Sequence, residues 1–432
     1  MPRSSVLSEV NIDVAEKSQP ARVLDPDRPF RILVAGNFSG GAGRNRRPME
    51  IDRDNFDQVM ALVAPELRLQ LAGGETAVSF KELEDFHPDQ LFARIPALRN
   101  VEAPAQTRPA AAAPAANLSG ADVLSMMMGE QPASARAPAR NDWDQMIHDL
   151  VAPYAAPAPQ AADPAVEATY ETRMREILHA PAFQELEAAW RGLFFLVRRL
   201  DTGGDLKLYL LDLPQESLSQ SAGLAELAQA LDARDISVTA GLYYFGKSGE
   251  ETLLRIAGLA KDAQVPFITG LAPEIAGLEE VFPSVRRAQC APWLGLALPR
   301  FLLRLPYGKD TSSIESFAFE EMTTPPPHRC YLWGNPAIAC AYLLGEAFSR
   351  YGWELRPGMV QDIDSLPAHT YRENGEAHLK PCAEVLLTEQ AAEFLLDRGI
   401  MPLASIKDTD RVRLVRFQSV ATPPAPLAGQ WD

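Results

Sequence analysis

Hydrophobic positions in residues 181–197 recur every three or four residues. This spacing predicts an α-helix with one wide apolar face. Pro181 suits the first helical position, where its missing N–H leaves no bond unmade. We expect this face to be the wall against which a larger domain packs. Its apolar positions are Phe183, Leu186, Trp190, Leu193, Phe194 and Val197.

After this helix, short apolar runs alternate with helical patterns. Such alternation favours a mainly parallel, layered sheet covered by helices. The expected strands are 206–211, 236–245, 265–269, 383–387, 402–406 and 412–417, with a strand leading into a short helix over 294–308. The expected helices are 215–231, 250–263, 335–348 and 389–397.

The first hundred residues predict a small α/β domain of their own. We expect a buried strand at 30–35, a helix over 55–63 that Asp54 caps, two short strands, and a helix opened by Asp85-Phe-His-Pro-Asp89 and running to Leu98. The two short strands are 67–71 and 77–80. Residues 5–14 partly alternate as in a half-exposed strand, which could pair within its own domain or with a neighbouring molecule.

Residues 101–168 are rich in alanine and proline, which is typical of an extended linker. Two short amphipathic islands interrupt this linker, and each must dock on the chain's own domains or on a partner to be stable. Their candidate docking residues are Val123, Leu124 and Met127 in the first, and Trp143, Met146, Ile147 and Leu150 in the second. The predicted class is α/β: a small domain (1–100), this linker (101–168), a larger layered domain (169–420) and a loose tail (421–432).

Composition argues against several classes of function. A formal charge of −16 over 432 residues argues against a nucleic-acid binder, which needs a cationic face. The sequence lacks an apolar run long enough to span a membrane, and its N-terminus lacks the core of a signal peptide, so we expect a cytoplasmic protein without membrane contact. The cysteines show no C-x-x-C pair and predict reduced thiols: Cys290, Cys330, Cys340 and Cys382.

Three motifs are candidates for chemistry. Gly241 to Ser248, with Lys247, matches the P-loop pattern, but its Leu, Tyr, Tyr and Phe favour a strand that ends in a turn. The glycine-rich residues 36–43 precede Arg44, Arg46 and Arg47, yet no helix opens from them as phosphate binding requires. His328 and Cys330 offer two metal ligands, fewer than zinc needs. We therefore expect no catalytic residue, cofactor or metal, and favour an interaction protein.

Three runs in the first hundred residues resemble the small subunit (TssB/VipA) of the type VI secretion contractile sheath. They are Phe30-Arg-Ile-Leu-Val-Ala-Gly-Asn-Phe-Ser-Gly40, Ile51-Asp-Arg-Asp-Asn-Phe-Asp57 and Asp85-Phe-His-Pro-Asp89.

Residues 170–418 are similar to the large subunit (TssC/VipB). The similarity lies in residues 177–193 with Trp190-Arg-Gly-Leu193, in residues 298–308, and in Phe317-Ala-Phe-Glu-Glu321, Tyr331-Leu-Trp-Gly-Asn335 and Lys380-Pro-Cys-Ala-Glu-Val385. The resemblance marks Phe183, Leu186, Trp190, Arg300, Phe301, Trp333 and Asn335 as packing residues of the family.

The resemblance implies a cytoplasmic structural protein that polymerises, or docks on a polymer, around a secreted inner tube. Expected partners are the two sheath subunits or copies of this chain, and further the inner tube, the baseplate or the recycling ATPase. The family's subunits are usually separate chains, and its large subunit continues beyond the position of Phe417. We therefore expect a fused, shortened subunit acting as an accessory, cap or junction element, with a genuine sheath protomer as the alternative and a P-loop enzyme as the second alternative.

Overall fold

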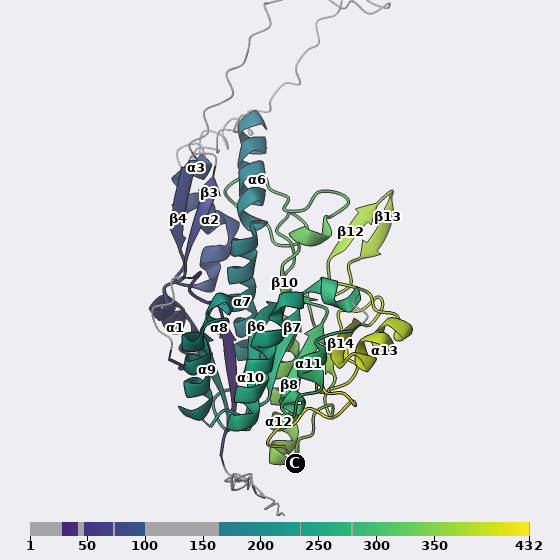
Figure 1. Ribbon diagram of the computed structural model, residues 1–432. Coiled ribbons are helices and arrows are strands. Elements are labelled where there is room, and N and C mark those ends of the chain that lie inside the picture. The colour runs from purple at the N-terminus through teal and green to yellow at the C-terminus, as the bar shows by residue number, and fades with distance from the viewer. Residues whose placement is uncertain are drawn as a thin grey trace, which may run out of the picture.

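The computed structural model describes residues 28–41, 47–71, 74–99, 164–233, 235–277 and 280–431. The predicted terminal strand at 5–14 and both amphipathic islands lie outside these residues. Figure 1 shows a central sheet with helices on its two faces and a smaller group of elements above it.

Within the described ranges, the central sheet has nine strands. Its inner strands run parallel from β14 to β5. At the edges, β2 is antiparallel to β5, β15 is antiparallel to β14, and β11 is antiparallel to β15. In spatial order the strands are β11 (Asp362–Ile363), β15 (Val412–Leu414), β14 (Ile400–Ser405), β8 (Leu294–Leu298), β7 (Phe267–Leu271), β6 (Val238–Phe245), β1 (Phe30–Gly36), β5 (Leu206–Asp212) and β2 (Met49–Ile51).

Strand β1 lies inside this sheet although it comes from the first hundred residues. It pairs with β5 from Phe30↔Leu206 to Gly36↔Asp212, and with β6 from Ile32↔Val238 to Ala35↔Gly241. Its burial on both faces explains its nearly continuous apolar sequence, which is typical of central parallel strands. The two sheath-like regions therefore share one sheet.

Helices cover both faces of the sheet. Ile32 and Val34 of β1 join the core under α7 (Pro181–Arg199) and α12 (Pro336–Tyr351), whereas Leu33 and Ala35 join the core on the opposite face. That opposite core contains α9 (Ser221–Ala233) and α10 (Glu250–Ala263). A Cβ on Gly192 of α7 would lie 3.2 Å from Ile338, so glycine allows α7 and α12 to approach closely.

The rest of the N-terminal part stands beside helix α6 (Pro164–Leu178), which rises above the sheet (Figure 1). Here α3 contacts α6, and η1 contacts α7. The elements are α1 (Phe56–Val63), β3 (Glu66–Leu71), β4 (Gly74–Ser79), η1 (Leu83–Phe86), α2 (Pro88–Arg94) and α3 (Pro96–Arg99).

Short elements complete the described fold. Two small sheets are β9 (Phe301–Leu302) with β10 (Trp333–Gly334), and the hairpin β12 (Thr370–Glu373) with β13 (Glu376–Leu379). The short helices are α8 (Gln215–Leu218), α11 (Pro283–Arg286), α13 (Glu389–Asp397), η2 (Lys247–Gly249), η3 (Pro273–Gly277), η4 (Ala291–Trp293), η5 (His328–Cys330) and η6 (Gly352–Glu354).

Most predicted elements are confirmed, and several boundaries are corrected. The helix predicted after Asp85 is three short helices because Pro88 and Pro96 each begin a new one. The helix predicted over 215–231 divides into α8 and α9. The N-cap residue of α1 is Asn55 instead of Asp54, and its side chain makes no capping bond.

Three further predictions are wrong. Residues 383–387 form no strand, because only Ala383 bridges to Phe301 while Val385 and Leu386 face solvent. The segment 303–308 after β9 contains no helix. The predicted linker is already helical from Pro164, where α6 begins.

The predicted loose tail is packed against the domain. Leu427 and Trp431 are 2% and 4% exposed. The backbone N–H of Ala428 donates to the Pro292 carbonyl at 2.8 Å, and the Gln430 side chain donates to the Gln264 carbonyl at 3.1 Å. The apolar residues of this segment therefore belong to the core. No helix in the described ranges is both long and apolar enough to cross a membrane.

Candidate functional site: the junction around helix α7

Besides strand β1, helix α7 carries contacts between the N-terminal part and the larger part. Its buried aromatic residues face an aromatic set from the first hundred residues. The Phe183 ring lies 5.6 Å from that of Phe86 and 6.1 Å from that of Phe80, and these two N-terminal rings stack at 4.3 Å. Edge-to-face pairs of this kind add stability beyond the area that they bury.

Trp190 fixes a second point of this contact. Its indole ring lies 5.2 Å from Phe38 and 5.8 Å from Phe56, and its Nε1–H donates to the Phe38 carbonyl at 2.9 Å. The indole is fully buried, so this hydrogen bond satisfies a donor that water cannot reach. Trp190 therefore holds the turn that follows β1.

The Asp85-Phe-His-Pro-Asp89 motif meets the segment 307–317 directly. The His87 ring packs against Tyr307 at 5.0 Å, and Phe92 of α2 packs against Phe317 at 5.0 Å. Asp89 accepts hydrogen bonds from the backbone N–H of Ser316 at 2.8 Å and of Glu315 at 3.1 Å. The two sets of family-like motifs thus contact each other.

A buried ion network lies under the same helix. Arg304 donates from Nε to Glu187 of α7 at 2.8 Å and from Nη1 to Glu321 at 2.7 Å. Arg191 donates to Glu187 at 2.6 Å and to the Tyr307 hydroxyl at 3.0 Å. Two carboxylates thus face two guanidinium groups, and the buried charges balance.

The network sets the protonation of Glu321. Burial alone would raise its pKa, but the charge of Arg304 and hydrogen bonds from Arg304 and the Tyr307 backbone hold the pKa at about 2. A buried carboxylate stays ionised only where such partners replace its hydration. The network ties α7 to the segment 304–321.

A second charged cluster joins the turn between β8 and β9, the short helix η5 and the segment after β13. Arg300 donates two bonds to Glu384, at 2.8 Å and 2.5 Å, and His328 Nε2 lies 3.2 Å from the same carboxylate. Burial opposes ionisation of Glu384, but the hydrogen bonds and charges of Arg300 and His328 lower its pKa to about 2. Lys380 lies 3.0 Å from His328 Nδ1 and over the rings of Tyr331 and Trp333.

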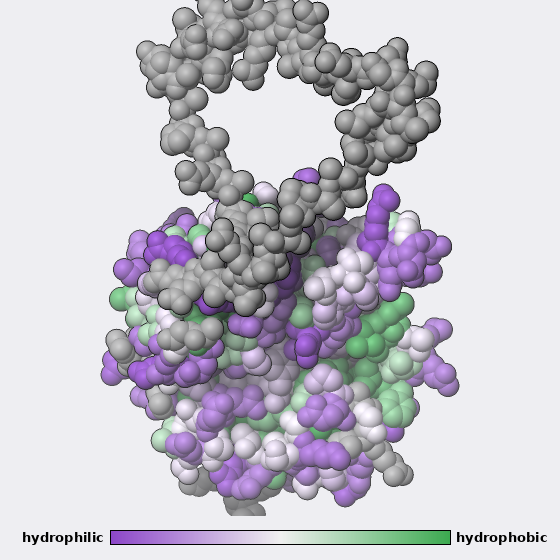
Figure 2. All heavy atoms as spheres, turned by 90° about the horizontal axis from the view of Figure 1, so that it is seen from above, coloured by the Kyte–Doolittle hydropathy of each residue, from purple (hydrophilic) through white to green (hydrophobic). Residues whose placement is uncertain are grey.

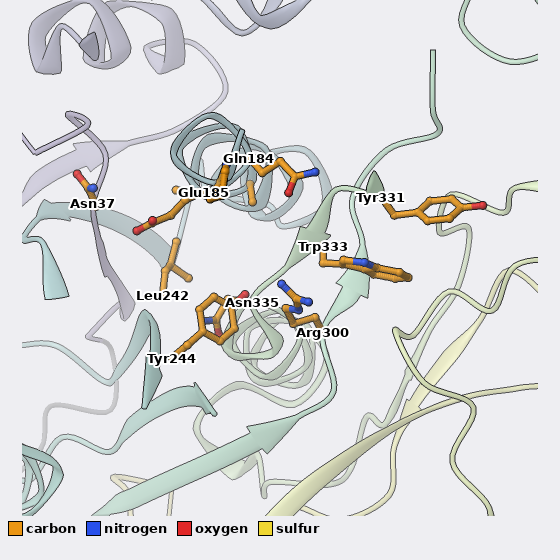
Figure 3. Close-up of a pocket in the computed structure, with 12 residues that line it drawn as sticks. Asn37, Gln184, Glu185, Leu242, Tyr244, Arg300, Tyr331, Trp333 and Asn335 are labelled. Carbon is orange, nitrogen blue, oxygen red and sulfur yellow. The ribbon is translucent and has the colours of Figure 1, made fainter. Parts of the chain in front are cut away.

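Between this cluster and α7 lies a pocket of about 240 Å³. Figure 3 shows Gln184 and Glu185 extending from α7 above it, with Tyr244, Arg300 and Asn335 below. Asn335 caps α12, because its side chain accepts from the Ala337 N–H and donates to the Tyr243 carbonyl, both at 2.9 Å. Tyr331 and Trp333 form the remaining aromatic wall.

The structure gives the P-loop pattern an ordinary structural role. Gly241 to Phe245 are extended in β6, where they cannot curl around a phosphate, and Lys247 lies in the exposed turn η2. At the end of β1, the N–H groups of Phe38 and Ser39 already donate to the Asp212 carboxylate at 2.9 and 3.0 Å, so they do not face a free anion site.

The metal hypothesis has no geometric support. His328 and Cys330 belong to the short helix η5, and His328 contacts Glu384 and Lys380. Within the described parts of the chain, no group of three or more His, Cys, Asp or Glu side chains is placed to hold a metal ion.

The predicted packing residues lie at two places. Phe183, Leu186 and Trp190 are buried on α7, whereas the others surround the start of α12 and the small β9–β10 sheet: Arg300, Phe301, Trp333 and Asn335. The predicted docking residues fall outside the described residues: Val123, Leu124, Met127, Trp143, Met146, Ile147 and Leu150.

Sequence analysis missed the charged residues of the buried network. Glu187 lies on the apolar face of α7, one helical turn from Phe183 and from Arg191, and that position signals a buried charge. Arg304 and Glu321 stand inside two of the quoted family-like motifs. Their pairing needed the fold, because nothing in the sequence brings 187, 304 and 321 together.

The outer surface carries an apolar patch. Val385, Leu386 and Phe394 are all at least 42% exposed. Figure 2 shows apolar surface on the side where α13 and the β12–β13 hairpin lie.

Two family models match the chain. The one described as "EvpB/VC_A0108, tail sheath N-terminal domain" (VipB) matches residues 164–232 and 280–421. The one described as "Type VI secretion system, VipA, VC_A0107 or Hcp2" matches residues 10–118. The two matched regions are the two that meet at α7.

A curated relative and solved structures were also found. The chain is 30% identical over 301 residues to the type VI secretion system sheath protein TssC1 of Pseudomonas aeruginosa, covering 60% of each chain. The chain therefore spans about 60% of that relative's length. The cryo-EM structure of the anti-feeding prophage baseplate matches with a TM-score of 0.32 and 14% identity over 54% of this chain and 50% of that chain. The contracted helical sheath of the same particle matches at 0.30 and 15%, over 51% and 48%.

Proposed function

Because the chain belongs to the VipA and VipB families of type VI secretion sheath proteins, we propose that it is a structural component of a contractile sheath in which one polypeptide supplies both subunit types. The proposal assigns it no catalytic reaction and no cofactor. It places the protein in the cytoplasm, where such a sheath assembles.

One observation carries the proposal. The VipA-like part inserts β1 between β5 and β6 of the VipB-like part, and its His87 and Asp89 contact the segment 307–316. A sheath built from two subunit types needs them in one fixed arrangement. Here a shared sheet and a shared core provide that arrangement within one chain.

The partners follow from this role. We propose that the chain associates with separate sheath subunits or with copies of itself, and acts within the sheath or at its end as an accessory, cap or junction element. A genuine protomer of the sheath body is the alternative. The inner tube, the baseplate and the recycling ATPase are further candidates for contact.

Imaging would test the proposal. The chain, carrying a small electron-dense label at its C-terminus, would be co-expressed with the separate sheath subunits and viewed by electron microscopy. Label at filament ends only would support the end element and contradict the protomer. Label along the filament, or long filaments of this chain alone, would support the protomer. Absence of label from every filament would contradict the sheath role itself.

A further inference from the structure

The pocket beside α7 has a composition that suits one kind of ligand. Tyr244 and Trp333 supply aromatic surface, and Asn37 and Gln184 supply polar groups (Figure 3). Its volume of about 240 Å³ is below the roughly 300–1,000 Å³ of small-molecule sites. The pocket is therefore sized for a single side chain.

Two charged residues line the pocket, Arg300 and Glu185, and they differ in whether they are paired. Arg300 is already held by two hydrogen bonds from its guanidinium group to Glu384. Glu185 stands at the rim and, among the described residues, makes no ion pair. Loss of hydration at the pocket wall and the negative charge of Glu216 raise the pKa of Glu185. A cation beside Glu185 would offset both effects.

Aromatic walls favour the same kind of ligand. Cations are attracted to the faces of tyrosine and tryptophan rings, and more strongly where water is excluded. Lys380 lies 5.6 Å from the centre of the Trp333 ring and Arg300 lies 5.8 Å from the centre of the Tyr244 ring, so each ring already has one cation of the chain near it. An anion would instead meet the free carboxylate of Glu185.

We propose that this pocket receives one basic side chain, arginine or lysine, from a partner polypeptide. The charge binds at Glu185, and the aliphatic stem lies along Tyr244, on the same side of the pocket. The inference goes beyond the sheath role and does not depend on it, because it specifies the chemistry of the pocket and leaves open which protein supplies the side chain.

Ligand-observed NMR would test this with defined probes. Acetyl-arginine methylamide, acetyl-lysine methylamide and the neutral analogue acetyl-citrulline methylamide would each be titrated into the full chain, and saturation transfer to the side-chain protons measured. We expect saturation for the arginine probe, the lysine probe or both, and at least fivefold weaker binding of citrulline.

Matched variants distinguish binding of the probes in the pocket from their general attraction to an acidic protein. Glu185→Gln is expected to weaken binding of the cationic probes at least fivefold, and Tyr244→Leu to weaken it as well. Glu393→Gln, an equal charge change at an exposed position of α13, should leave binding unchanged. Unfolding curves would confirm that each variant is folded. Equal binding of citrulline and arginine, or no effect of Glu185→Gln, would overturn the proposal.

Discussion

Arg304 bonds two buried carboxylates at once, and each belongs to a different part of the fold. Glu187 comes from α7, and Glu321 from a segment that also contacts the N-terminal part. Because the partners of Arg304 are buried, loss of either would leave an ion without water or a counter-charge. The stability of the junction therefore depends on the presence of all three charged side chains.

The first prediction is that Arg304→Met destabilises the protein by about 3–5 kcal/mol, the usual cost of breaking a buried ion pair. Urea unfolding would measure this. Arg255→Met is the control, because Arg255 pairs with Glu251 on the exposed surface of α10 and should cost only about 0.5 kcal/mol. Equal losses in the two variants would contradict a structural role for the network.

The second prediction concerns acid. The pKa of Glu321 is about 2 in the folded protein and near its ordinary value of about 4.3 in the unfolded chain. The unfolded chain therefore binds more protons below pH 4.3, and stability falls as the pH drops from there toward 2. Glu321→Gln should be less stable at pH 7, with a shallower loss in this window, as measured by urea midpoints at a series of pH values. The pKa of Glu384 is also about 2, so this second carboxylate should retain part of the pH dependence of stability in the Glu321→Gln variant.

Sequence analysis could find the apolar residues of the junction but not its charged ones. Phe183, Leu186 and Trp190 follow helical spacing and are buried as that spacing indicates. Glu187 and Arg304 are polar residues whose burial depends on segments far apart in the chain. Composition cannot identify which charges of an acidic protein are paired inside it.

At the scale of elements, α7 is the surface that the two parts share. One of its sides packs against α12 through Gly192, and another receives the rings of Phe38, Phe56 and Phe86. The helix therefore joins the sheet layer to the N-terminal part, and neither contact is local in sequence.

The third prediction is that Phe86→Ala costs about 3–5 kcal/mol, because the side chain is fully buried. A double-mutant cycle with Phe183→Ala should give a coupling energy of about 0.5–1.5 kcal/mol for the pair of rings. Phe394→Ala on α13 is the control, since that ring is 42% exposed and should cost about 1 kcal/mol or less. Additive losses from Phe86 and Phe183 would contradict their direct contact.

A fourth prediction concerns the P-loop pattern. ATP at millimolar concentration should leave the thermal unfolding midpoint unchanged, because residues 241–245 are extended in β6. Lys247→Ala should behave like the original chain in this assay. A nucleotide-dependent rise in the midpoint that Lys247→Ala abolishes would contradict the assignment.

The periodicity of apolar residues predicts the long helices well. Proline residues account for errors in the predicted bounds of the short ones. Helix α10 begins and ends where the pattern indicates, whereas Pro88 and Pro96 divide the helix predicted after Asp85. Residues 383–387 look like a strand in sequence, yet only Ala383 bridges to β9, at Phe301. Pairing partners are set by tertiary structure, which local pattern does not contain.

At the scale of the whole molecule, two family-like regions form one structure. The N-terminal part provides an inner strand of the main sheet and part of the same hydrophobic core. Removing it would expose the edges of β5 and β6 and apolar side chains on both faces. Neither region is complete without the other.

The fifth prediction follows from this. A protease site inserted between residues 101 and 163 and then cut under native conditions should leave the two pieces associated during size-exclusion chromatography. Separation should require denaturant, because β1 is bonded on both sides. Pieces that elute separately without denaturant would contradict the shared sheet.

The position of β1 also has a consequence for synthesis on the ribosome. Gly36 pairs with Asp212, so β1 is made 176 residues before the end of its partner strand. At about 5–20 residues per second, this apolar strand waits roughly 9–35 s before β5 exists to pair with it. During that interval its open edges can bind other nascent chains or a chaperone. An apolar strand of this kind is open to wrong pairing until its partner strands have been made.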